Sequence, residues 1–311
     1  MAAPVFRAAG AKSVGTTGAV TVSAPTGVAT DDLEILIAEC ATANTISITN
    51  NGGSSWSAMT GTPVTVTGGE RLYVWSRVRQ SGDGNPQVQA SADHLCACRL
   101  AYQTGTFDPS DPFEIETTSN ETTSDTSFSW APGTSTTGID RVVLVISTIL
   151  RDSNTASVPV CTNANLTSLA SRANYCTTQG NGGGFGCTEG TRAASGAVGT
   201  FACTYLAASA KAYISFAIKP YVVQQYPISI GPVSLSTSVT TWRTGKVPRT
   251  LSLTSAVAAR RFTKIARALS LASAVGTIVE KLPGGPQQLQ EAVDAALATV
   301  VALKRKLRIH L

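Results

Sequence analysis

Asp32-Leu33-Glu34-Ile35-Leu36-Ile37-Ala38-Glu39-Cys40 is the stretch that decides the fold of the larger part of this sequence. It follows a turn signal at Pro25-Thr26-Gly27, and its apolar run with isoleucines at alternate positions is typical of a β-strand. We therefore take it as the first strong strand of the chain.

Similar runs follow it along the chain, each separated from the next by a cluster of turn residues. Strands are predicted at Val64–Val66, Arg71–Val78, Leu95–Tyr102, Phe113–Glu116, Val142–Ile149 and Ala212–Ile218. Turns are predicted at Gly68-Gly69, Gly82–Pro86 and Pro132-Gly133. Helical periodicity is almost absent here, so we expect a mainly β fold: an N-terminal antiparallel, jelly-roll-like β-sandwich over residues 1–222.

A six-residue pattern that occurs three times marks the next segment, residues 223–281. Ser234–Val239 recurs as Ser252–Val257 and as Ser270–Val275, each copy displaced by 18 residues. A unit of this size buries too little apolar surface to be stable alone, so we expect a stalk of stacked units. Its repeat core would consist of Leu235, Val239, Leu253, Val257, Leu271 and Val275. Both helix and strand fit the repeat, and its alternating residues favour strands interleaved among three chains.

The last segment, residues 282–311, begins with a break at Leu282-Pro283-Gly284-Gly285-Pro286 and continues with a helical pattern. Apolar residues spaced four and three apart predict a coiled coil. The positions that would mediate oligomerisation are Leu289, Val293, Ala296, Val300, Leu303 and Leu307. Further apolar positions widen the stripe, which favours a homotrimer over a dimer. An amphipathic helix folded back on its own domain is the alternative.

The sequence argues against a secreted protein and against a membrane-spanning protein. The chain is 43% hydrophobic and 14% charged, with no signal-peptide pattern and no apolar stretch that could span a membrane.

Residues 232–311 hold 12 lysines and arginines against three acidic residues, whereas the other residues hold 12 against 16. The basic residues recur with the repeat and have little aromatic interleaving. We therefore expect a solvated stripe of charges, or contact with an acidic protein shell, rather than contact with nucleic acid.

The seven cysteines are an odd number, which argues against a full disulfide framework. Four of them flank a region rich in glycine and asparagine: Cys161, Cys176, Cys187 and Cys203. Their spacing lacks a CxxC pattern, so a zinc site has little support. Free thiols and disulfides formed outside the cell both fit these four.

Few residues fit a catalytic or metal site. His94, Cys96 and Cys98 would share one face of a strand, but ligands in a flat row diverge from tetrahedral geometry. Asp108 and Asp111 alternate with prolines and are interpreted as a turn rather than as paired catalytic acids. We expect no enzyme activity, no cofactor and no metal.

The glycine-rich run Gly180–Gly186 lacks the residues of a phosphate-binding loop and is interpreted as a flexible surface loop. Loops at the end of a sandwich can bind sugars. Tyr175 and Phe185 are therefore candidate glycan contacts.

Together, the strand Asp32–Ile37, the segment Gly52–Trp56, the run Gly69–Trp75 and the run Cys96–Tyr102 resemble sandwich domains of tailed-bacteriophage structural proteins. The repeat with its periodic basic residues resembles repeats of phage fibre and tail proteins. These resemblances imply a virion structural protein of the fibre, tail or head-decoration type, made in the host cytoplasm. Its partners would be copies of itself and other virion proteins. A receptor-binding or glycan-binding module of a tail fibre is the second hypothesis.

Overall fold

A computed structural model describes residues 2–41, 43–153 and 158–221 of the chain. By internal contacts the chain divides into two units, Met1–Gln225 and Tyr226–Leu311, and every described residue belongs to the first. The described residues form strands and turns, and none of them lies in a helix that could cross a membrane. The predicted stalk and C-terminal coiled coil, with all their core and oligomerisation residues, lie outside the described residues.

The first main sheet is built from the N-terminal half of the described chain. Its strands are paired in the order β1-β10-β4-β8-β6, with β2 also pairing with β10 and β7 with β8. Every pairing is antiparallel. The strands are β1 (Phe6–Ala9), β2 (Ser13–Gly15), β4 (Leu33–Ala41), β6 (Ser57–Ala58), β7 (Val64–Thr65), β8 (Glu70–Val78) and β10 (Leu95–Tyr102).

The second main sheet comes from the C-terminal half and is also antiparallel, in the order β11-β17-β13-β15-β14. Its strands are β11 (Phe113–Trp130), β13 (Arg141–Ile149), β14 (Thr167–Thr177), β15 (Gly183–Arg192) and β17 (Phe201–Ile218). Two smaller sheets complete the fold. One has the order β3-β9-β5, with β3 (Val20–Thr21), β5 (Ile46–Asn50) and β9 (Gln87–Ala90), and the other pairs β12 (Ser135–Thr136) with β16 (Gly196–Ala197).

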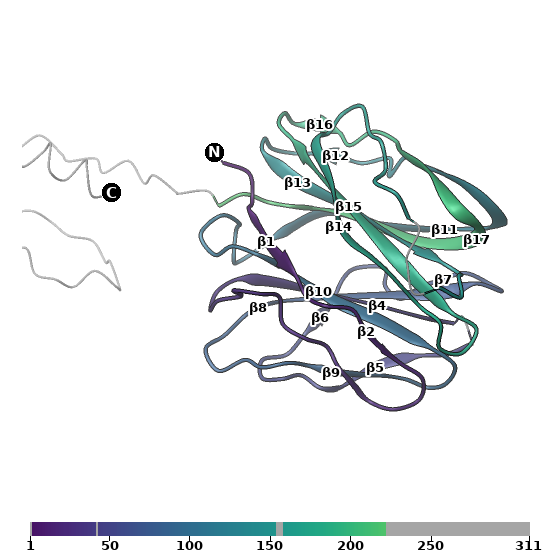
Figure 1. Ribbon diagram of the computed structural model, residues 1–311. Coiled ribbons are helices and arrows are strands. Elements are labelled where there is room, and N and C mark those ends of the chain that lie inside the picture. Colours follow the sequence, from purple (N-terminus) through teal and green to yellow (C-terminus); the bar gives the residue numbers. More distant parts are fainter. Residues whose placement is uncertain (1, 42, 154–157, 222–311) are drawn as a thin grey trace, which may run out of the picture. The chain divides into compact units, whose positions relative to one another are not determined.

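Figure 1 shows the sheets as layers, with the first main sheet between the second main sheet and the small sheet β3-β9-β5. The alternation of side chains in β4 explains how that middle layer is buried on both faces. Leu33 and Ile35 belong to the core between the two main sheets, whereas Leu36 and Ala38 belong to the core against the small sheet. All nine residues of β4 are buried. A strand covered on both faces is mostly apolar rather than alternating, and in β4 only Glu34 and Glu39 are charged.

The other face of the second main sheet carries a third apolar cluster. Residues of β13 and β17, such as Val143 and Tyr213, pack there against residues of the connecting segments, such as Cys161, Leu166 and Val198. Connections therefore cover the outer face of this sheet, which buries apolar side chains on both of its sides.

Thr106 holds both ends of the described unit. The backbone N–H of Val5 donates to Oγ1 of Thr106 at 3.0 Å, and the N–H of Tyr221 donates to the Thr106 carbonyl oxygen at 3.0 Å. An isolated antiparallel bridge between Phe107 and Pro220 lies beside them. The chain therefore enters and leaves the sandwich at the same place.

A mainly β fold of antiparallel sheets is confirmed for the described residues. Strand β10 has the predicted bounds, and the predicted segments Arg71–Val78 and Val142–Ile149 lie in β8 and β13. The flexible loop predicted at Gly180–Gly186 is wrong in its second half, because Gly183 and the residues after it form β15. That strand lies between β13 and β14 in its sheet and is buried from Gly183 to Gly190, so glycine there permits close packing rather than mobility.

Candidate functional site

His94, Cys96 and Cys98 all face the second main sheet. Cys96 and Cys98 belong to the apolar core between the main sheets, and His94 lies at its edge, fully buried. In the β4–β10 register Cys96 is paired with Glu39, which brings Glu39 to the same face of the sheet. The shared face predicted for the three residues is confirmed, although His94 lies just before β10 rather than in it, and a carboxyl group joins them there.

The imidazole of His94 forms a buried pair with Glu39. Its Nε2 atom lies 2.8 Å from Oε1 of Glu39, and its Nδ1 atom lies 3.4 Å from Oδ1 of Asp93. Burial lowers the pKa of His94, but the hydrogen bonds and charges of Glu39 and Asp93 outweigh burial and raise this pKa to about 9. Burial raises the pKa of Glu39 to about 7, against the opposing effect of His94.

A second carboxyl group, Glu70 at the start of β8, completes this buried acid–base cluster. Its Oε2 atom accepts a hydrogen bond from Oγ1 of Thr148 at 3.2 Å. Burial, followed by the charge of Glu39, raises the pKa of Glu70 to about 8. Within the described residues, neither Oε1 of Glu70 nor Oε2 of Glu39 has a hydrogen-bond partner. At neutral pH Glu70 therefore carries a proton.

Gly183 closes the cluster from the side of the second main sheet. A Cβ atom at this position would lie 2.3 Å from Nε2 of His94 and 2.7 Å from Oε1 of Glu39. Nearby, the backbone N–H of Asn181 donates to Oδ1 of Asp93 at 2.8 Å. Part of the predicted glycine loop thus packs directly on the histidine pair, and only glycine fits at residue 183.

The buried acid–base cluster can hold and release protons, because all three of its titratable side chains are removed from solvent and shifted in pKa. Within the residues that the structure describes, no group of three or more histidine, cysteine and carboxylate side chains could hold a metal ion.

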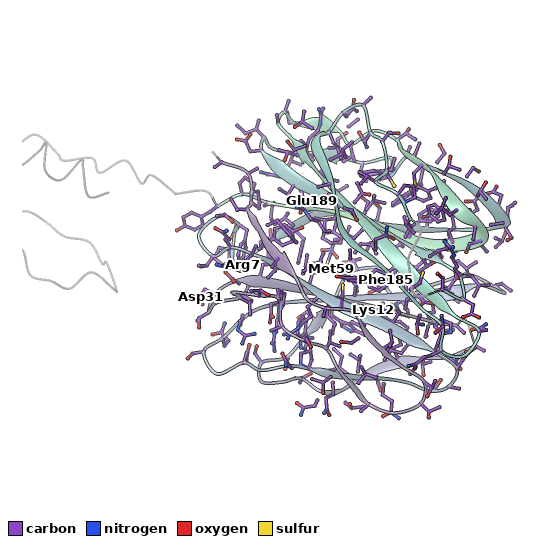
Figure 2. The ribbon with its side chains drawn as sticks, viewed as in Figure 1. Arg7, Lys12, Asp31, Met59, Phe185 and Glu189 are labelled. Atoms are coloured by element: carbon purple, nitrogen blue, oxygen red, sulfur yellow. The ribbon has the colours of Figure 1, made fainter. Side chains whose placement is uncertain are left out.

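The two candidate glycan contacts lie in different surroundings. Phe185 is fully buried between the main sheets (Figure 2), which excludes a direct contact of its ring with a sugar in this structure. Tyr175 is partly buried, packs edge-on to Phe185 with ring centroids 6.4 Å apart, and donates its hydroxyl to the Gly10 carbonyl oxygen at 3.1 Å. Both rings therefore support the packing of β14 and β15.

The segment 108–112, which carries the carboxylates of Asp108 and Asp111, forms a turn. Oδ1 of Asp108 accepts hydrogen bonds from the Ser110 hydroxyl at 2.7 Å and from the Ser110 N–H at 3.0 Å. These hydrogen bonds hold the pKa of Asp108 below its usual value, despite some opposing burial. Asp111 instead forms an ion pair with Lys219. The predicted turn is thus confirmed.

The four cysteines of the C-terminal half lie on two different faces of the second main sheet. Cys187 faces the core between the main sheets, whereas Cys161, Cys176 and Cys203 belong to the outer apolar cluster. The Sγ atoms of Cys161 and Cys203 lie 3.2 Å apart. Cys203 is partly exposed and, with neighbouring residues, lines an open hollow of about 510 Å³.

A group of buried arginines went unrecognised in the sequence. Glu34 is fully buried. Its carboxylate accepts hydrogen bonds from Nε of Arg77 at 2.8 Å, from Nη1 of Arg99 at 2.9 Å and from Nη1 of Arg79 at 3.3 Å. Burial lowers the pKa of Arg99 to about 10, although Glu34 opposes this shift. The available signal was that these arginines lie in or beside strands of otherwise apolar character, where charged residues must be paired.

A second missed contact joins the main sheets. The Tyr102 hydroxyl donates to Oε2 of Glu189 at 2.5 Å, and Nη2 of Arg172 donates to Oε1 of the same carboxylate at 2.6 Å. Arg172 also lies over the ring of Phe6, 4.2 Å from its centroid. The Glu189 carboxylate thus connects side chains of β10, β14 and β15, and Arg172 extends the contact to β1.

Comparison of the chain with protein-family models, with curated proteins and with solved structures gives no match.

Proposed function

We propose that this protein is a non-enzymatic structural component of a bacteriophage particle, namely a short trimeric fibre, spike or decoration protein attached to the tail or capsid. One observation carries the proposal: three sequence copies in an 18-residue register, followed by an apolar seam from Leu289 to Leu307. Stacked repeats and a coiled-coil seam both require neighbouring chains to bury their apolar faces. In this proposal the C-terminal quarter of the chain assembles the protein, and the sandwich is carried by the assembly.

The interior of the sandwich suits a protein that acts through its shape. Glu34 connects strands β4, β8 and β10, and Glu189 connects the two main sheets through Tyr102. Buried polar networks whose members are paired favour one rigid arrangement of a core.

The jelly-roll winding remains a prediction. The strand order gives it no support, because the chain crosses between the main sheets once, between β10 and β11.

The basic C-terminal quarter indicates an acidic partner. Its 12 lysines and arginines against three acidic residues would complement an acidic surface of a capsid or tail protein. We therefore assign the stalk to attachment and the sandwich to the outer part of the particle.

The alternative role in glycan binding is less well supported. It relied on Tyr175 and Phe185, and Phe185 is fully buried while the Tyr175 hydroxyl is engaged by Gly10. The residues between β14 and β15 that remain outside strands are few, and Asn181 among them is bonded to Asp93.

Mass by light scattering on the full chain tests the assembly. We expect three times the 32.1 kDa of one chain, and a monomer for a truncation ending at Val223, which keeps the apolar cores of the sandwich. In the full chain, Val300→Asp places a charge in the predicted seam and should dissociate the trimer. The control Ala298→Asp places the same charge at an outward position and should leave the trimer intact. A monomeric full chain would overturn the proposal.

The location in a particle needs a separate measurement. If the assembled protein belongs to a virion, its peptides should appear by mass spectrometry in gradient-purified phage particles at a fixed ratio to the capsid protein. Their presence in the soluble lysate alone would contradict the virion assignment while leaving the trimer untouched.

A further inference from the structure

Cys161 and Cys203 lie directly opposite each other on two antiparallel segments. Thr162 and Ala202 form an isolated bridge in which each N–H donates to the other's carbonyl oxygen, at 2.7 and 3.0 Å. In an antiparallel pair, the residues next to such a bridge face each other without backbone hydrogen bonds, with Cα atoms about 4.5 Å apart. That separation lies within the range that a disulfide spans. The distance of 3.2 Å between the two Sγ atoms agrees with this register.

The two thiols differ in their access to solvent. Cys161 is buried in the outer apolar cluster, and its N–H donates to Oγ1 of Thr188 on β15 at 3.0 Å, which fixes the backbone of the segment. Cys203 is partly exposed and lines the open hollow together with Pro159, Val160, Thr162, Ala202 and Thr204. A small reagent can therefore reach the sulfur of Cys203 first.

The hydrogen bond between the thiols also affects their ionisation. The S–H of Cys203 stabilises a thiolate on Cys161 and so lowers the pKa of Cys161 below the usual value of a thiol, against the effect of burial. The same hydrogen bond, followed by burial, raises the pKa of Cys203 above the usual value, so the first proton lost belongs to the pair. Burial raises the pKa values of the remaining shifted cysteines, such as Cys96 and Cys98. Thiolate, rather than thiol, is the species that attacks a disulfide.

We propose that Cys161 and Cys203 are a reactive dithiol, which a small-molecule disulfide of the glutathione type converts into an intramolecular disulfide. The crosslink ties the covering segment that contains Cys161 to strand β17 and so fixes the outer face of the second main sheet. This modification is independent of the proposed virion role.

The exchange proceeds in two balanced steps. One proton leaves the hydrogen-bonded pair and the remaining proton moves to Cys161. The more exposed sulfur of Cys203, now a thiolate, attacks a sulfur of the small disulfide, breaks its S–S bond and releases one small thiolate. The Cys161 thiol then loses its proton and attacks Sγ of Cys203, which forms the protein disulfide and expels the second small thiolate. Two protein thiols are oxidised, and one small disulfide is reduced to two thiols.

Among the described residues, Cys161 and Cys203 are the only two cysteines whose sulfur atoms lie within hydrogen-bonding distance of each other, and Cys176 is fully buried. Cys96 and Cys98 are two residues apart on one strand, and Cys187 lies on the opposite side of the second main sheet from Cys161. Cys40 belongs to the core against the small sheet and donates its S–H to the Asn44 carbonyl oxygen. The reaction should therefore be confined to one pair.

Treatment of the reduced full-length protein with oxidised glutathione tests the proposal. Thiol titration in denaturant should fall by two of the seven cysteines, and peptide mapping should recover one crosslink, Cys161 to Cys203. Since the crosslink joins residues 42 apart, the melting temperature should rise by roughly 5–15 °C and return on reduction. Failure to lose two thiols, or a crosslink between other cysteines, would overturn the proposal.

Two matched variants sharpen the test. Cys161→Ser should stop the reaction at the first step and leave a glutathione adduct on Cys203, detected as an intact mass. Cys40→Ser keeps a hydrogen-bond donor beside Asn44 and should form the same crosslink as the unmodified sequence. If Cys203→Ser shows the same oxidation-dependent rise in melting temperature, the stabilisation has another origin and the assignment is wrong.

Discussion

Nε2 of His94 lies 2.8 Å from Oε1 of Glu39, and both side chains are fully buried between the two main sheets. The residues are 55 positions apart in the sequence. Strand β10 returns beside β4, and this return places a base at the end of one strand against an acid on the other. The protonation of this pair, with Glu70 beside it, is therefore linked to folding.

The buried acid–base cluster should make the sandwich less stable as the pH rises. The folded pKa of His94 is raised from 6.5 to about 9, so its stabilisation is fully present below pH 6.5 and is lost as the pH rises through 9. The folded pKa of Glu70 is raised from 4.5 to about 8, so stability also falls as the pH rises from 4.5 through 8. Between pH 6 and 9 each group on its own would lose about two units, at about 1.4 kcal/mol per unit, and because the two groups are coupled we expect a combined loss on the order of 3–5 kcal/mol.

Urea midpoints measured across this pH range check the prediction. Glu70→Gln keeps the shape of the protonated carboxyl and should flatten part of the slope, with stability near that of the unmodified protein at pH 5 and higher at pH 8.5. A stability that is constant between pH 6 and 9, or an unchanged slope in Glu70→Gln, would contradict the assignment.

Gly183→Ala should destabilise the sandwich by about 2–4 kcal/mol. The new methyl group would lie within 2.7 Å of both members of the His94–Glu39 pair, so one of them must move in a closely packed interior. Thermal melting of the variant gives the measurement. Gly18→Ala is the matched control, because its methyl group would meet no atom within 4 Å, and it should change the stability by less than about 0.5 kcal/mol.

Glu34→Gln should cost about 3–5 kcal/mol, because it removes the carboxylate that three guanidinium groups share in a buried site. Denaturant unfolding at pH 7 measures the loss. For comparison, Glu121→Gln weakens a partly exposed ion pair with Lys211, which keeps Asp125 as a partner, and should cost less than about 1 kcal/mol. Equal losses in the two variants would show that the Glu34 cluster is not held as described.

Phe185→Ala should reduce the free energy of unfolding by about 3–5 kcal/mol, since it leaves a cavity between the main sheets. Leu206→Ala removes a side chain that is 77% exposed and should stay within about 0.5 kcal/mol. Calorimetry on both variants separates a core role of Phe185 from a surface role. A stable Phe185→Ala variant with weakened binding to cells would instead favour the glycan contact.

The strands that could be predicted from the sequence were those with continuous apolar runs. Leu95–Tyr102 is buried along its whole length, and its sequence is apolar except at Arg99, so it carries the signal of a covered strand. Strand β15 gave the opposite signal, because close packing at Gly183, Gly184 and Gly186 requires glycine, which in isolation favours loops. Strand β11 is polar along most of its 18 residues, so only its first few residues were recognised.

The candidate site could be predicted only within a single strand. The common face of His94, Cys96 and Cys98 follows from the two-residue period of a strand. The contact of His94 with Glu39, and the position of Glu70 near Glu39, depend on the pairing of β4 with β10 and of β8 with β4. No local pattern states which strands become neighbours. The same limit applies to Cys161 and Cys203, whose opposition results from one isolated bridge.

Thr106 bonds to Val5 near the start of the sandwich and to Tyr221 at its end. Because the two ends meet at one residue, the sandwich could be inserted into a surface loop of another protein without separating the two ends of that loop. The same closeness favours circular permutation, in which a short linker joins residue 221 to residue 2 and new ends are opened at an exposed turn such as Gly82.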